Sequence, residues 1–175
     1  MRRIAVILVV AVLAAFGCMA THQMKRVGAA AGASRKLEAG AAIAVLVPAN
    51  GRYENKVYSG SGQATAQSLV AAFAQHAEPV DPINARDCND AQQKAAEKNY
   101  AYLICPTILH WEDRATEWSG ISDKIEVRIQ LRDARSGSVV DTVIIAGQSK
   151  WASFGGDHPQ ELLAKPFDRY AVSLY

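Results

Sequence analysis

The stretch Asp123–Arg132, DKIEVRIQLR, alternates between polar or charged side chains and large apolar ones. The apolar positions are every second residue: Ile125, Val127, Ile129 and Leu131. Successive side chains of a β-strand point to opposite faces of the sheet, so this period of two predicts a strand with one face in the core and one in water. The rest of the sheet can be built outward from this strand.

The segment before this strand carries charges that match it. Folding the chain back about Gly120 places Arg114 opposite Glu126 and Glu112 opposite Arg128 on the polar face. The same register brings Leu109 and Trp111 to Ile129 and Leu131 on the apolar face. Because a slip of one residue would lose both sets of pairs, the sequence predicts a long hairpin over residues 107–132.

Shorter patterns predict further strands and helices. Apolar runs bounded by turn residues predict strands at 41–47, 79–83, 100–105 and 139–146. Helical spacing predicts a helix after an N-cap at Ser61, a second from Asn89 through Lys98, and a third capped by Asp157. Pro106 is expected to break or bulge its strand, and Pro166 to end the third helix.

Together these elements predict a single α/β domain over residues 41–175. We expect a mixed five-stranded sheet with two to three helices on one face, in the order β-α-β-α-β-β-β-α. The class is an α+β sandwich.

The first residues indicate export. Arg2 and Arg3 precede an apolar run of 13 residues, Ile4–Phe16, which fits a signal peptide over residues 1–17 and is too short to span a bilayer. The junction Ala-Phe-Gly-Cys resembles the lipobox of bacterial lipoproteins, so we expect Cys18 to carry acyl chains such as palmitate. Ordinary cleavage after Ala20 is the alternative. Met19, rather than aspartate, indicates sorting to the outer membrane.

Charge and composition exclude some functions. The chain has 19 Lys and Arg against 17 Asp and Glu, and removing Arg2 and Arg3 with the signal leaves 17 against 17 in the mature chain. A neutral exported chain of about 158 residues (175 less 17) has no basic stripe, so nucleic acid is not an expected partner. No Cys/His cluster has zinc spacing, and no metal or other cofactor is expected.

Residues 19–40 are rich in Ala and Gly and show no apolar period. With Cys18 they are interpreted as a lipidated N-terminus and tether, 18–40, and a flexible coil of this length reaches about 25 Å. Alternatively, Arg35–Ala39 form a helical turn packed on the domain.

Two further cysteines invite a geometric test. If the helix after Cys88 runs antiparallel to the strand that ends at Cys105, the two thiols return to the same level. A disulfide is then reachable in an oxidising periplasm, with a buried free thiol at Cys105 as the alternative.

The segment HWEDRATEWSG, residues 110–120, holds candidate chemical groups. His110, Asp113 and His158 could serve general acid/base catalysis if a pocket gathered them. However, His110 falls on the polar face, and no nucleophile with a base is recognisable, so no catalytic residue is assigned. Asp113 falls on the apolar face beside Val127.

The tryptophans provide a second candidate site. Trp111, Trp118 and Trp151, together with Asp113, could form a partner surface, because tryptophans are enriched at binding hot spots. The alternative is that they close the core, which we favour for Trp111, whereas Trp118 lies near the predicted hairpin tip.

Three strings resemble a known family. PTILHWEDRATEWSGISDKIEVRI (106–129), KWASFGGDHPQELL (150–163) and CMATHQ (18–23) resemble a family of small proteobacterial lipoproteins classed as a domain of unknown function. The resemblance implies a cell-envelope lipoprotein without assigned activity or catalytic residues. The order of elements is also similar to the TolB N-terminal domain and to lipoprotein activators of peptidoglycan synthases, in fold only.

The sequence therefore favours a non-enzymatic lipoprotein of the Gram-negative outer membrane that faces the periplasm. Its expected partners are the membrane, through the lipid, and another envelope protein or cell-wall component. The alternative is a periplasmic hydrolase or small-ligand-binding lipoprotein that uses residues 110–117 and 157–158.

Overall fold

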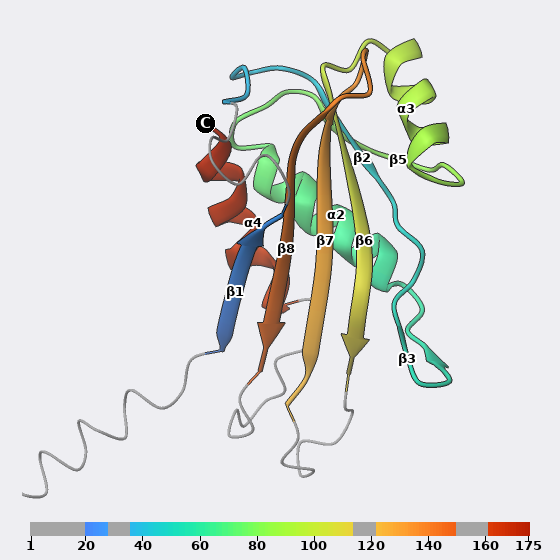
Figure 1. Ribbon diagram of the computed structural model, residues 1–175, viewed down its shortest axis with the longest axis vertical. Coiled ribbons are helices and arrows are strands. Elements are labelled where there is room, and N and C mark those ends of the chain that lie inside the picture. The colour runs from blue at the N-terminus through green and yellow to red at the C-terminus, as the bar shows by residue number, and fades with distance from the viewer. Residues whose placement is uncertain (1–19, 28–35, 114–121, 150–160) are drawn as a thin grey trace, which may run out of the picture.

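The structure, a computed structural model, describes residues 20–27, 36–113, 122–149 and 161–175. A mixed six-stranded sheet runs in the order β1-β8-β7-β6-β2-β5 (Figure 1). Its strands are β1 Thr21–Arg26, β2 Ile43–Leu46, β5 Val80–Ile83, β6 Tyr102–Glu112, β7 Lys124–Asp133 and β8 Val139–Gln148. β2 is parallel to β5 and β6, and the other neighbours are antiparallel. β3 Arg52–Tyr53 and β4 Lys56–Val57 form a separate hairpin.

Helices cover both faces of this sheet. α2 Ser61–Phe73 and α4 Glu161–Leu174 lie side by side on one face, where both contribute to the larger core (Figure 1). α3 Cys88–Glu97 packs on the opposite face, in a smaller core with the alternate residues of β2 and β6. The α/β class and mixed sheet are confirmed, but the expected single helical face is wrong. The run 41–47 is apolar throughout because β2 is buried on both sides.

The predicted hairpin exists as β6 and β7, but in a different register. Trp111 lies opposite Ile125 and Glu112 opposite Lys124, so the predicted pairing of Glu112 with Arg128 is wrong. β6 ends at Glu112 and β7 begins at Lys124, and the expected turn about Gly120, with Arg114, lies outside the described residues.

Within the same hairpin, a bulge in β6 changes which face of the sheet a side chain points to. The register shifts between Ile108 and His110, which leaves Leu109 as the extra residue. Leu109 is therefore 44% exposed rather than in the core.

Pro106 and Pro166 disrupt their strand and helix less than predicted. β6 continues through Pro106, which is paired with Ile129. The pairing of β6 with β2 reaches only Ile104, so Pro106 lies where one side of the strand has no ladder to lose. α4 continues through Pro166, so the expected break there is wrong.

The N-cap predicted at Ser61 is also wrong. The cap position is Gly60, whose φ of 86° is left-handed. The Ser61 hydroxyl instead accepts from the Gly51 amide at 2.8 Å and donates to the Tyr58 carbonyl at 2.7 Å, which ties the β3–β4 loop to α2.

The sixth strand, β1, lies within the stretch predicted as a tether. Residues 21–26 pair antiparallel with β8 along their whole length, from Thr21 opposite Gln148 to Arg26 opposite Val143. The flexible-coil interpretation is therefore wrong for residues 21–26. Leu37, farther along the same stretch, is buried, and its amide donates to the Leu174 carbonyl at 2.8 Å.

Arg26 fastens one end of β1. Its Nε lies 3.1 Å from Oδ2 of Asp141 in β8, and its Nη2 donates to the Ser173 hydroxyl of α4 at 2.7 Å. The Asp141 side chain is 0% exposed, and 26% of the Arg26 side chain is exposed. A buried carboxylate is costly without a partner, so this ion pair joins β1 to both layers of the fold.

His22 lies at the other end. Its imidazole packs beside the backbone of Leu162 at the start of α4, and its Nε2 is buried without a hydrogen-bond partner. Burial, followed by the charge of Arg169, lowers the pKa of His22, and the charge of Lys165 acts in the same direction. Gly147 of β8 is the cross-strand partner of His22. A Cβ added at Gly147 would lie 3.1 Å from Leu162 Cβ, so β8 and α4 approach closely at this point.

Replacing Arg26 should loosen this arrangement. Arg26→Ala leaves the Asp141 carboxylate buried and unpaired, and we expect a loss of about 2–3 kcal/mol, less than for a fully buried pair because Arg26 is partly exposed. Urea unfolding followed by circular dichroism measures the loss. Lys25→Ala, on the exposed neighbour, is the matched control and should change stability by less than about 0.5 kcal/mol. Equal losses would show that the ion pair does not fasten β1.

Acidification should destabilise the folded state through His22. The folded state holds His22 with a lowered pKa, whereas the unfolded chain binds the proton near the ordinary value of about 6.5. Stability from this group is therefore present above pH 6.5 and falls as the pH drops below it. Urea midpoints at pH 7.5 and 5.5 should differ less in His22→Asn than in the wild type. His76→Asn is the control, and the same acid sensitivity in wild type and His22→Asn would contradict the assignment.

Candidate functional site

The polar face of the sheet carries a hollow at the end where β1 begins. It has a volume of about 330 Å³, and residues of four strands line it, among them Thr21, Gln23, His110, Lys124, Glu126 and Ala146. The hollow lies beside a cross-strand row in which Thr21, Gln148, Lys124 and Glu112 are successive partners. The start of β1 and the end of β6 are therefore at the same level of the sheet.

His110 is the titratable side chain of most chemical interest at this hollow. Its Nε2 lies 3.1 Å from Oε2 of Glu112, which is 3% exposed, and the Tyr53 ring meets the imidazole edge-on at a centroid distance of 5.1 Å. The sequence placed His110 on the polar face, as found, but it placed Glu112 on a solvated surface, which is wrong. This contact orients the imidazole.

The catalytic alternative required His110, Asp113 and His158 to be together, and the first two line different hollows. Asp113 lines a different hollow, of about 600 Å³, beside the β3–β4 hairpin, where its carbonyl accepts from the Tyr58 hydroxyl at 3.4 Å. His158 lies outside the described residues. Over the part of the chain that the structure describes, no three His, Cys, Asp or Glu side chains are grouped to hold a metal ion.

A third hollow, of about 500 Å³, lies where the parallel strands β2 and β5 end. Residues 46–50, 85–88 and 105–108 line it. Cys88 and Cys105 are joined by a disulfide at this wall, with their Cα atoms 5.8 Å apart. The bridge ties the start of α3 to β6, at the level where the sequence argument brought the two thiols together.

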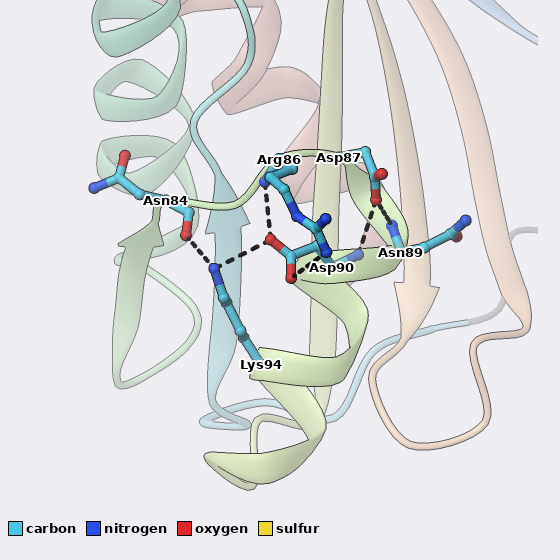
Figure 2. Close-up of polar contacts among 6 residues, drawn as sticks. All are labelled: Asn84, Arg86, Asp87, Asn89, Asp90 and Lys94. Atoms are coloured by element: carbon cyan, nitrogen blue, oxygen red, sulfur yellow. Dashed lines mark hydrogen bonds and ion pairs between the residues drawn. The ribbon is translucent and has the colours of Figure 1, made fainter.

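Polar contacts among charged residues hold the start of α3 (Figure 2). α3 begins at Cys88, one residue before the predicted start, because Asp87 is its N-cap: Oδ1 accepts from the amides of Asn89 and Asp90 at 2.8 and 2.9 Å. Asp90 in turn accepts from the Arg86 amide at 2.9 Å and from Lys94 Nζ at 3.2 Å.

The same contacts decide what Asp90 can do. The backbone hydrogen bond from Arg86, followed by the hydrogen bond from Lys94, lowers the pKa of Asp90 to about 2. Lys94 also donates to the Asn84 carbonyl at 3.0 Å (Figure 2). Asp90 therefore stays ionised and committed to the helix start, which makes it a structural group rather than an acid or base for chemistry.

Of the three tryptophans predicted for a partner surface, Trp111 is the one within the described residues. Trp111 is 2% exposed and belongs to the larger core, so its place in a partner surface is wrong and the core interpretation is confirmed. Trp118 and Trp151 lie outside the described residues, as does Cys18.

Known structures share this fold at low sequence identity. The PelC dodecamer from Paraburkholderia phytofirmans is similar, with a TM-score of 0.61, 19% identity, and coverage of 86% of this chain and 96% of that one. Protein XCC0632 from Xanthomonas campestris, of the DUF330 family model, has a TM-score of 0.51 at 14% identity over 80% of this chain and 86% of its own. At these identities the likeness shows the fold alone.

Sequence comparison assigns the family. No curated protein sequence matches the chain significantly. A family model described as "Domain of unknown function (DUF4823)" matches residues 35–174, which include every described strand and helix except β1. The chain belongs to the DUF4823 family.

Proposed function

We propose that this protein is a lipid-anchored, non-enzymatic module of the bacterial cell envelope, held on the periplasmic side of the outer membrane through Cys18. It binds another envelope component and carries out no chemistry of its own. The proposal extends the resemblance to proteobacterial lipoproteins. It names no substrate, and the membrane is its first partner.

One observation carries the proposal: β1 begins at Thr21, three residues after Cys18, and is fastened to β8 and α4. An anchor at Cys18 thus pulls on the folded sheet itself. Among the described residues, no helix has the length and apolar character to cross a membrane. Acyl chains hold a protein stably when two or more are present, as lipoprotein processing supplies.

The arrangement of polar groups supports binding over catalysis. His110 and Asp113 line separate hollows, and Asp90 is held in the α3 network. β1 is an edge strand of the sheet, and none of the other described strands pairs with its outer side, where a strand of another chain could add.

The anchor is tested by replacing the acylated residue. Wild-type protein should incorporate radiolabelled palmitate and fractionate with the outer membrane, whereas Cys18→Ser should incorporate none and leave the membrane fraction. Met19→Asp is the matched variant: it keeps the cysteine, and we expect palmitate uptake with a shift toward the inner membrane. Identical fractionation of wild type and Cys18→Ser would refute the lipid anchor.

Self-assembly is a second candidate, favoured by β1 as an exposed edge and by the fold likeness to PelC, which is described as a dodecamer. An amine-reactive crosslinker in intact cells should then give a ladder of multimers of this chain. Lys25→Arg keeps the charge of β1 but removes its reactive amine, so it should weaken the ladder, whereas Lys98→Arg should not. Crosslinks to other proteins alone, found by mass spectrometry, would contradict self-assembly.

A further inference from the structure

We infer that the end of the sheet at which β1 begins, together with the β3–β4 hairpin, rests against the lipid headgroups. The inference rests on the proposed anchor at Cys18. It adds a defined membrane-facing surface and therefore a fixed orientation of the domain, where the sequence predicted a free tether.

The first step is the reach of the chain between the anchor and the sheet. Cys18 and Thr21 are three Cα–Cα steps apart, which span at most about 11 Å. Ala20 already packs against the larger core, so Met19 alone provides most of the slack. This is far shorter than the ~25 Å reach of a tether over residues 19–40.

The second step is what lies at the same level as Thr21. The cross-strand row from Thr21 through Gln148 and Lys124 to Glu112 crosses four strands, or about 14 Å at the usual strand spacing. The β3–β4 hairpin adjoins this row, since Tyr53 packs against His110 at 5.1 Å and His110 is two residues from Glu112. In Figure 1 the starts of β1 and β7, the ends of β6 and β8, and β3 all lie at the lower end of the molecule.

The third step is that β1 cannot peel away to lengthen the anchor. A pull on Thr21 acts first on the His22 side chain packed over Gly147 and on the backbone ladder to β8, and only then on the ion pair of Arg26 with Asp141. The acylated residue therefore holds the sheet end, rather than a loose strand, at the membrane surface.

The chemistry of the hairpin suits an interface. Arg52 and Lys56 are exposed cations, Val57 is 44% exposed, and Lys56 Nζ lies 4.5 Å from the Tyr58 ring centroid. Cationic, aromatic and apolar groups side by side match the phosphate and glycerol layer of a bilayer, where lysine and arginine extend to the headgroups. Glu54, at the tip, is the opposing charge.

The opposite end of the sheet then points into the periplasm. Asp133 lies nine positions after Lys124 in β7, or about 30 Å along the strand. Lys98 is exposed and directly follows α3. It lies near that far end, because β6 begins there at Tyr102, four residues after Lys98.

Site-specific quenching tests this orientation on full-length lipidated protein. Lys56→Cys, Lys124→Cys, Lys98→Cys and Arg128→Cys are each labelled with bimane without reduction, which leaves the Cys88–Cys105 bridge intact. The proteins are placed in phosphatidylethanolamine–phosphatidylglycerol vesicles that contain a nitroxide-headgroup lipid. We expect several-fold stronger quenching at positions 56 and 124 than at 98, with 128, on the polar face at mid-sheet, between them.

A spacer provides the matched control. Inserting about twelve Gly and Ser residues between Ala20 and Thr21 adds roughly 20 Å of flexible reach, so the difference between positions 56 and 98 should disappear while the protein still floats with vesicles. Equal quenching at 56, 124 and 98 in protein that floats would overturn the orientation but leave the anchor standing. Strongest quenching at 128 would overturn it in favour of a flat sheet. Failure of the wild type to float would overturn the anchor, and this inference with it.

Discussion

The ion pair between Arg26 and Asp141 is the constraint on which the arrangement of this protein depends. Asp141 is a fully buried carboxylate in β8, and its charge is tolerable there because a guanidinium from β1 reaches it. Arg26 also contacts Ser173, so one side chain joins the first strand, the last strand and the last helix. At the other end of β1, His22 packs beside the backbone of Leu162 in α4.

The two faces of the sheet differ in how they are covered. α2 and α4 bury the apolar side of β6, β7 and β8, which leaves the opposite side of these strands polar and hollowed around His110. α3 covers only the part of that second side formed by β2 and the start of β6, and the Cys88–Cys105 bridge holds it there. Hence the chemically varied groups, among them His110, Asp113 and Asp90, are spread over separate parts of the surface.

The strands were predictable where one rule governs a whole stretch. Residues 123–132 alternate because one face of β7 is wet, and 41–47 are uniformly apolar because β2 is covered twice. The hairpin register was not predictable, because the bulge at Leu109 shifts the strand pairing and the pattern of charges in the sequence does not reveal a bulge. β1 escaped prediction because its side chains are mostly exposed and its stability comes from residues more than a hundred positions away. The break expected at Pro166 did not occur because α4 continues through it, although Pro166 leaves the Leu162 carbonyl without its helical donor.

The closure of the fold by β1 has a consequence for biogenesis. Arg26 must find Asp141, 115 residues later, and Ser173, 147 residues later, so β1 is among the last strands to acquire its partners. Contacts of such long sequence separation carry a loop-closure cost and slow folding. Under the proposed anchoring through Cys18, acyl transfer can be completed on a chain whose amino-terminal strand is still unpaired, so the anchor does not depend on a folded domain.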